Sequence, residues 1–178
     1  LVETDLPGYL STNDSNGGTD NQIAIVLAAG TNSLGNYFLD KSSCVASDAL
    51  TGYVASSTPA NGATGISLGT TTLQVTFNQP MSTIGGGSVL DAHNFDDKLV
   101  NMSLGGDVSI TNVSYNPNTR TVTLTIDTAD ADWKAGSHYR LRVKGGIKSA
   151  CDVGQGINVD LLFYTDTQIS GQVRHDIN

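Results

Sequence analysis

Hydrophobic and polar residues alternate along the stretch Ser56–Pro80, close to the middle of the chain. Leu73, Val75 and Phe77 alternate with threonine, glutamine and asparagine. A period of two is typical of a β-strand that buries one face. A lead-in rich in proline and glycine precedes this strand. We therefore expect the strand to be part of a principal domain that extends from about residue 55 to 166.

The same alternation recurs in later segments of this domain. Further strands are expected at Asp107–Tyr115, Thr121–Ile126, His138–Lys144 and Ile157–Thr165, with weaker ones around Val89–Leu90 and Leu99–Met102. Turn residues separate these segments, and Asn116–Thr119 is the strongest hairpin turn. Many short strands joined by turns predict an all-β fold, an immunoglobulin-like β-sandwich. Within Asp107–Tyr115 the alternation of apolar and polar residues shifts by one position between Ile110 and Val113. This shift predicts a β-bulge near Thr111 and Asn112.

The first 41 residues predict a smaller set of strands. Leu1–Asp5, Gln22–Ala29 and Asn36–Asp40 each carry a short apolar pattern, and a polar loop lies between the first two. Three strands of this length cannot bury a stable core alone. We expect them to be part of a second β-sandwich that residues 167–178 or a neighbouring chain completes, with residues 42–54 as a linker.

Composition and charge exclude several classes of partner. The chain has a formal net charge of −8, and 15% of its residues are charged. Such a chain repels the phosphates of nucleic acids, so we expect no nucleic-acid partner. No apolar run approaches the roughly 18 residues that a membrane-spanning helix requires, so we expect no membrane insertion.

The two cysteines, Cys44 and Cys151, do not form a CxxC motif. They fit either a disulfide that closes a long loop or two buried thiols. A disulfide of this span stabilises a protein by about 4–5 kcal/mol in the chain-entropy model. Together with the sparse lysine and arginine, a disulfide would indicate an extracellular protein.

Both ends of the chain resemble one known module. The pattern ET-x-x-PGY-x-ST, an Asp/Asn/Gly loop, an alternating strand and GN-x-F-x-D resemble the end of the B-type repeat of serine-aspartate-repeat surface adhesins, which is a relative of the collagen-adhesin B domain. Residues 169–178 are similar to the first strand of that repeat. The resemblance implies two pieces of adjacent modules, or matching pieces of one split module.

The central domain resembles another family. The motifs S-x-PANGATG, TTxLxVTFNxPM, TRTVTLT and W-x-AGxxYRLRV are similar to bacterial Ig-like domains of surface-layer and other exported proteins. Those domains act as spacers, stalks and adhesion modules. The resemblance implies an extracellular or cell-surface location.

Calcium is the cofactor that the sequence favours. Asp14, Asn16 and Asp20 place hard oxygen ligands on a glycine-containing loop, which suits Ca²⁺. The adhesin repeats bind calcium through such loops, and the resemblance adds Asp176 and Asn178 from the last strand. A solvated polar loop is the alternative. For the cluster Asp127/Asp130/Asp132 we favour a solvated hairpin end over a second calcium site.

No catalytic centre is expected. Gly65–Gly69 matches the G-x-S-x-G pattern of a nucleophile elbow, but the elbow needs a strand before the serine and a helix after it. We therefore expect Ser67 to be a turn residue. The histidines His93, His138 and His175 have no partner at metal-ligand spacing, and we expect surface or strand positions for them.

Glu3 corresponds to a glutamate that promotes a Lys–Asn isopeptide crosslink in collagen-adhesin relatives. The matching strand here carries Arg174 instead of lysine, and a permanently protonated guanidinium is no nucleophile. We therefore expect a structural role for Glu3.

We expect a non-enzymatic structural or adhesive module of a bacterial surface or filament protein. Its partners would be copies of itself or adjacent modules, joined head-to-tail by β-strand addition. The assembly strand would carry Ile169, Gly171, Val173 and Ile177. The alternative is a carbohydrate- or receptor-binding accessory module of a secreted multidomain hydrolase. The single tryptophan, Trp133, and six tyrosines offer little aromatic surface for sugars.

Overall fold

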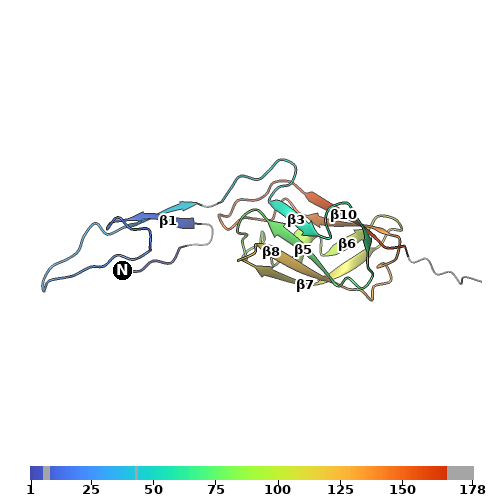
Figure 1. Cartoon of the computed structure of the whole chain (residues 1–178), viewed down its shortest axis with the longest axis horizontal. Coiled ribbons are helices and arrows are strands. Elements are labelled where there is room, and N and C mark those ends of the chain that lie inside the picture. The colour runs from blue at the N-terminus through green and yellow to red at the C-terminus, as the bar shows by residue number, and fades with distance from the viewer. Residues whose placement is uncertain (6–8, 43, 168–178) are drawn as a thin grey trace, which may run out of the picture.

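The structure is a computed structural model that describes residues 1–5, 9–42 and 44–167. Figure 1 shows a β-sandwich and, outside it, a two-stranded hairpin with a long loop. The described residues contain no α-helix, only the short 3-10 turn η1 (Ala92–Phe95). None of their helical segments has the length and apolarity to cross a bilayer. The predicted all-β class is thereby confirmed.

Two layers of strands form the sandwich. One layer has the order β3-β5-β8-β7, and the other has the order β7-β6-β9-β10-β4. Strand β4 lies parallel to β10, and the other neighbours are antiparallel. The strands are β3 (Val54–Thr58), β4 (Ala63–Ile66), β5 (Thr72–Phe77), β6 (Lys98–Asn101), β7 (Asp107–Asn116), β8 (Thr121–Ile126), β9 (His138–Val143) and β10 (Val159–Thr165).

Strand β7 belongs to both layers. Its first residues pair with β6 as far as Ser109, and its later residues pair with β8 from Ile110 onward. The register with β8 shifts between Ile110 and Asn112. The predicted bulge is therefore confirmed, and it lies where the strand changes partner, because a bulge increases twist and bends a strand.

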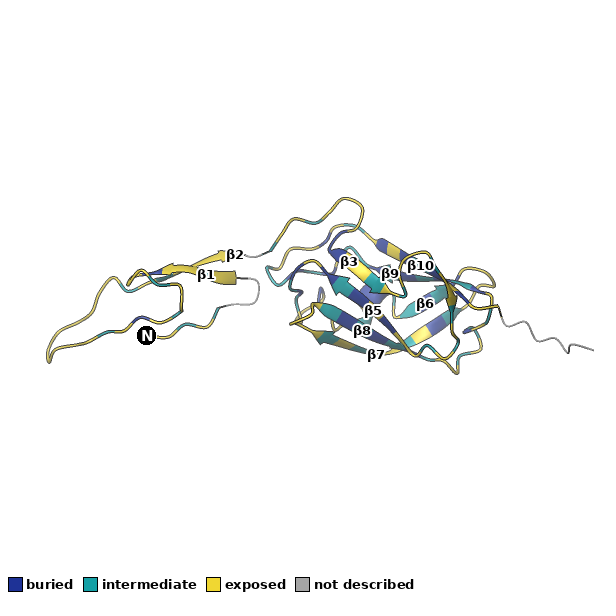
Figure 2. Cartoon of the chain, viewed as in Figure 1, coloured by how far each residue is buried: buried dark blue, intermediate teal, exposed yellow. Residues whose placement is uncertain are grey.

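The core lies between the two layers and follows the predicted alternation. In β5, Leu73, Val75 and Phe77 are buried, and β8, β9 and β10 alternate in the same way. Figure 2 shows these strands banded in dark blue and lighter colours. Each fully buried side chain of this size contributes about 1.5–3 kcal/mol. The core residues that these three strands add are Val122, Leu124, Ile126, Tyr139, Leu141, Val143, Val159, Leu161 and Phe163.

Two sequence expectations within the sandwich are wrong. The proline- and glycine-rich lead-in that begins at Ser56, expected to precede the first strand, contains most of β3, which pairs with β5, and all of β4, which pairs with β10. The strand expected around Val89–Leu90 is instead a turn that leads into η1. The side chains of Ser88 and Asp91 accept hydrogen bonds from the backbone N–H of Leu90 (3.1 Å) and His93 (3.0 Å). Such local bonds compete with sheet pairing.

Residues 44–53, within the segment expected to be a linker, lie against the sandwich. Tyr53 is fully buried, its N–H donates to Oε1 of Gln155 (3.1 Å), and its hydroxyl donates to the carbonyl of Val153 (3.2 Å). The Val45 N–H donates to Oε1 of Gln79 (2.7 Å). These bonds position the segment along one end of the sandwich.

The N-terminal part has fewer strands than the sequence predicts. Strands β1 (Tyr9–Asp14) and β2 (Phe38–Ser42) form an antiparallel pair. The expected strands at 1–5 and 22–29 make only an isolated bridge, between Val2 and Gln22. Among the described residues no second layer faces the hairpin, and Figure 2 shows most of this part exposed. Ile23 is buried, but without a facing layer most of the alternating pattern has no core against which to pack.

Candidate functional site

The loop that follows β1 brings three predicted calcium ligands together. Asp14 ends β1 with only 1% of its surface exposed. Its Oδ1 accepts hydrogen bonds from the N–H groups of Gly18 (2.8 Å) and Asn16 (3.2 Å). Its Oδ2 is buried and has no hydrogen-bond partner among the described residues. A buried carboxylate oxygen without a partner is costly, because nothing compensates its lost hydration.

Side-chain oxygens converge on one side of Gly18. A Cβ atom added to Gly18 would lie 3.1 Å from Asp14 Oδ2, 3.2 Å from Asp20 Oδ1 and 3.3 Å from Asn16 Oδ1. Calcium takes six to eight oxygen ligands at about 2.3–2.6 Å. The loop thus offers three converging oxygens of the right chemistry, and further ligands would have to come from elsewhere. Asp176 and Asn178, the other predicted ligands, lie outside the described residues.

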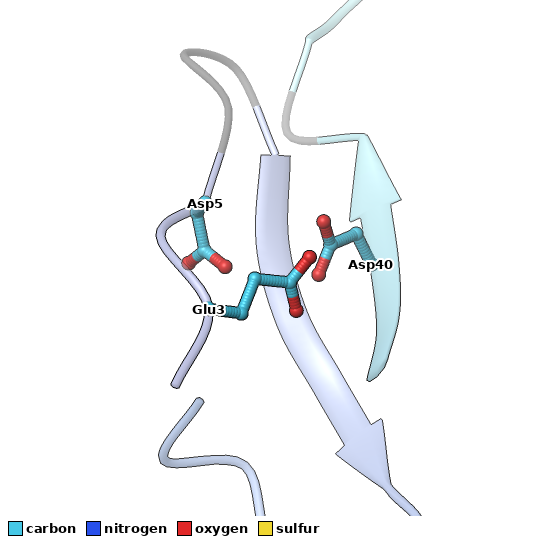
Figure 3. Close-up of side chains that lie close together, drawn as sticks. All are labelled: Glu3, Asp5 and Asp40. Carbon is cyan, nitrogen blue, oxygen red and sulfur yellow. The ribbon is translucent and has the colours of Figure 1, made fainter. Parts of the chain in front are cut away.

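A second acidic cluster joins the N-terminal segment to β2. Glu3, Asp5 and Asp40 each place a carboxylate oxygen within 4.8 Å of the others, and Figure 3 shows the three side chains beside β1. Asn21 Nδ2 donates to Asp5 Oδ1 (2.9 Å). Glu3 Oε2 is buried without a partner among the described residues. Loss of hydration, and then repulsion from Asp40 and Asp5, raises the pKa of Glu3 above its ordinary 4.5.

Sequence reasoning singled out Glu3 but missed Asp5 and Asp40 as its neighbours. The pairing of Ser11 with Asp40 between β1 and β2 brings Asp40 to this place. The bond from Glu3 N–H to the carbonyl of Asn21 (3.0 Å) holds the first segment nearby. No local pattern signals either contact. The structure places Glu3 against carboxylates. The strand with Arg174 lies outside the described residues, so the structural role of Glu3 stays a prediction.

The residues considered for catalysis lie apart. Ser67 Oγ accepts from Gly69 N–H (3.1 Å) and its carbonyl accepts from Thr70 N–H (3.0 Å), so Ser67 is a turn residue as expected. His93 lies in η1 with its Nδ1 3.2 Å from Asp97 Oδ2. His138 stacks on Tyr164 with 4.2 Å between ring centroids. His175 lies outside the described residues, as does the assembly strand with Ile169, Gly171, Val173 and Ile177.

The acidic loop after β8 has structural roles. Asp127 Oδ1 accepts from the N–H of Ala129 (3.0 Å) and Asp130 Oδ1 accepts from that of Asp132 (2.9 Å). Asp132 Oδ2 accepts from Asp107 N–H (3.3 Å). These carboxylates satisfy backbone donors of successive turns, which fits the hairpin-end interpretation.

Trp133 is a core residue and not a sugar platform. It is 6% exposed, its Nε1 donates to the carbonyl of Leu68 (2.9 Å), and its ring lies 4.8 Å from that of Tyr139. A tryptophan buried in this way has no free face for a sugar ring. The ligand-binding alternative therefore loses its strongest candidate residue.

Cys44 and Cys151 form a disulfide, with 2.07 Å between sulfurs and 6.3 Å between Cα atoms. The bond joins the segment before β3 to the loop between β9 and β10. Such bonds persist in oxidising compartments.

The comparisons with known proteins concern the sandwich. Residues 49–165 match the model of the bacterial Ig-like domain family, Big_5. No curated protein matches the chain. Among solved structures, the chain is similar to surface layer protein SbsC, domains 1–6, with a TM-score of 0.45 and 16% identity over 70% of this chain and 15% of that one. It is also similar to the S-layer protein rSbsC, with a TM-score of 0.40 and the same identity and coverage. The matched part of the chain thus spans about 15% of the length of either protein.

Proposed function

The chain belongs to the bacterial Ig-like domain family, and we propose that it is a non-enzymatic structural module of a bacterial cell-surface or extracellular filament protein. Family membership supports this role, because such domains are stalks and spacers in exported proteins. The continuous core of the sandwich gives a rigid body, and the disulfide fits an oxidising environment outside the cytoplasm.

One observation carries the more specific part of the proposal: the N-terminal hairpin and its loop expose most of their apolar side chains, although Ile23 is buried. Val26 is 99% exposed and Leu34 is 88% exposed. Leu10 and Leu27 are each 59% exposed, and Leu39 is 49% exposed. A two-stranded hairpin is at best marginally stable in water. Apolar surface of this kind is typical of a module that another segment completes.

We propose that a strand from a neighbouring copy completes the hairpin. The segment Ile169–Ile177 has the sequence pattern of a first strand of the same repeat, with Ile169, Gly171, Val173 and Ile177 in one phase. Strand addition supplies main-chain hydrogen bonds and buries alternate side chains. Repeated head-to-tail, this contact gives an open filament, because a heterologous contact need not close. The assignment of both ends to B-type adhesin repeats is part of this proposal.

Calcium binding is the second specific proposal. The partnerless Oδ2 of Asp14 and the converging oxygens of Asn16 and Asp20 suit a hard cation. A bound ion would supply the positive charge that the buried Oδ2 of Asp14 lacks. It would also link the end of β1 to the loop that leads to Gln22, because Asp14 ends β1 and the other two ligands, Asn16 and Asp20, lie in that loop.

Sedimentation velocity and electron microscopy of the full chain test the assembly. The proposal predicts elongated species whose size grows with protein concentration. Val173→Asp places a charge on the apolar phase of the assembly strand and should abolish growth, whereas Gln172→Asp, in the opposite phase, should leave it. A chain that remains monomeric at all concentrations, with calcium present, contradicts the proposal.

A further inference from the structure

The outer face of the β6-β9-β10 layer has an unusual arrangement of charges. We call the residues Val100, His138, Arg140, Leu162 and Tyr164 the Arg140 face. They all belong to the strand phase that points away from the core, since their neighbours along each strand are buried. Cross-strand pairing places Val100 and Leu162 on either side of Arg140, and Tyr164 beside His138.

Other cations of this layer are neutralised within the chain. Lys98 Nζ lies 2.6 Å from Asp107 Oδ2, and Arg142 makes two hydrogen bonds with Asp160, of 2.7 and 2.9 Å. Lys144 Nζ lies 3.0 Å from Asp96 Oδ1. Each of these three cations is therefore already paired with a carboxylate of the same chain.

Arg140 differs from these cations. It has no ion pair and no side-chain hydrogen bond among the described residues, and its Nε is buried without a partner. Its immediate cross-strand neighbours, Val100 and Leu162, are apolar and half-buried. Asp160, two residues before Leu162 in the same outward phase, interacts with Arg140 electrostatically but forms its ion pair with Arg142. A carboxylate that reaches the half-buried guanidinium would therefore add the direct contact that Arg140 lacks. The guanidinium also prefers planar, two-oxygen acceptors.

The N-terminal part of the chain has an excess of negative charge, opposite in sign to Arg140. In residues 1–48 the side-chain charges are Glu3, Asp5, Asp14, Asp20, Asp40 and Asp48 against Lys41. In the cluster Glu3/Asp5/Asp40, three carboxylates lie together, Glu3 Oε2 has no partner, and Asp40 is exposed. A cation from outside would relieve their mutual repulsion.

The chain leaves the sandwich beside the Arg140 face. Tyr164, Thr165, Asp166 and Thr167 line one hollow together with Gly136, which lies two residues before the start of β9. A neighbour that receives the segment after Thr167 is therefore held close to this face. Steering by opposite charges also favours the encounter.

We propose that the Arg140 face binds the acidic hairpin of a second copy, with Arg140 paired to the cluster Glu3/Asp5/Asp40. This contact rests on the proposed head-to-tail assembly and adds to it a second attachment, made by side chains instead of a strand. Val100, Leu162 and the stacked rings of His138 and Tyr164 cover the apolar part of the hairpin.

Charge exchange between chains tests the contact by sedimentation velocity of the full chain. Arg140→Glu should weaken self-association by about tenfold or more, because like charges then meet. The matched control, Arg120→Glu, reverses the charge of an exposed residue in the β7–β8 turn and should change self-association little. Glu3→Lys combined with Asp40→Lys should weaken association as Arg140→Glu does. An equal mixture of the two variants should restore it, since each then presents the partner that the other requires.

The outcomes separate this contact from strand addition. If Val173→Asp abolishes assembly while Arg140→Glu matches Arg120→Glu, strand addition stands and the Arg140 contact is wrong. If Arg140→Glu weakens assembly, the mixture restores it and Val173→Asp has no effect, the Arg140 contact stands and strand addition is wrong. A mixture that associates no better than either variant alone also overturns the Arg140 contact.

Discussion

Cys44 is bonded to Cys151 across 107 positions of sequence, so the segment that precedes β3 is fastened to the loop between β9 and β10. The bond closes nearly the whole sandwich into one covalent loop. It therefore restricts the unfolded chain more than a short disulfide does, since loop-closure entropy grows, though slowly, with loop length.

Removal of the disulfide should destabilise the sandwich without changing its fold. We expect Cys44→Ser combined with Cys151→Ser to lower the free energy of unfolding by about 4–5 kcal/mol in the chain-entropy model. Guanidinium denaturation measures the change. The control is the wild type with its disulfide intact, measured under the same conditions. A double variant as stable as this control would show that the loop constraint contributes nothing.

The core should respond to the loss of single side chains. Leu124 on β8 is fully buried and lies opposite Leu73 of β5. Leu124→Ala should lower the free energy of unfolding by about 2–5 kcal/mol. Leu104→Ala, at a position that is 65% exposed, should change it by no more than about 0.5 kcal/mol. Equal effects of the two substitutions would contradict the described core.

The sandwich was largely predictable because the alternation of apolar and polar residues in most of its strands indicates which face of each strand is buried. Leu73, Val75 and Phe77 alternate with polar residues since only one face of β5 meets the other layer. Strand β3 was missed because Val54–Thr58 has only one large apolar residue, and its pairing with β5, for example Ser57 with Val75, decides its conformation. A pairing across the sheet leaves no local trace in such a segment.

The N-terminal part shows the converse. Gln22–Ala29 alternates like a strand, yet Val26 and Leu27 are exposed and only Gln22 makes a bridge. Ile23 is buried at 3% exposure, but the described residues contain no second sheet layer against which the rest of the segment packs. The Asp14 loop was predictable because its ligands are close in sequence. The cluster Glu3/Asp5/Asp40 was not, because strand pairing and loop contacts bring Asp40 to Glu3.

Calcium binding should depend on the Asp14 loop. Isothermal titration calorimetry of the wild type with calcium chloride should show binding, and Asp14→Asn should weaken it by about tenfold or more, because the site loses a charged ligand. Asp130→Asn is the control, since Asp130 belongs to the acidic turn after β8. Loss of binding in the control alone would move the site to that turn, and no heat in the wild type would remove the calcium proposal.

Acid should weaken the pair of Arg142 and Asp160. The two hydrogen bonds from Arg142 hold the pKa of Asp160 below its ordinary 3.8. A carboxyl whose pKa is lowered on folding adds stability above its unfolded pKa, and this stability is lost as the pH falls through the folded pKa. Both groups are partly exposed, so the effect is small.

Thermal unfolding of the wild type and Asp160→Asn over a pH series measures this contribution. The difference in melting temperature should be constant above about pH 5 and should shrink as the pH falls below 3.8. A difference that stays the same down to the lowest pH would show that the ionised pair does not contribute.

Hydrogen–deuterium exchange of the full chain, read peptide by peptide over a range of protein concentrations with calcium present, tests the assembly most directly. The proposal that a neighbouring copy completes the hairpin predicts that amides in residues 9–42 gain protection as concentration rises, while β5 and β8 in the sandwich core keep theirs. Exchange in residues 9–42 that is equally fast at every concentration would contradict it.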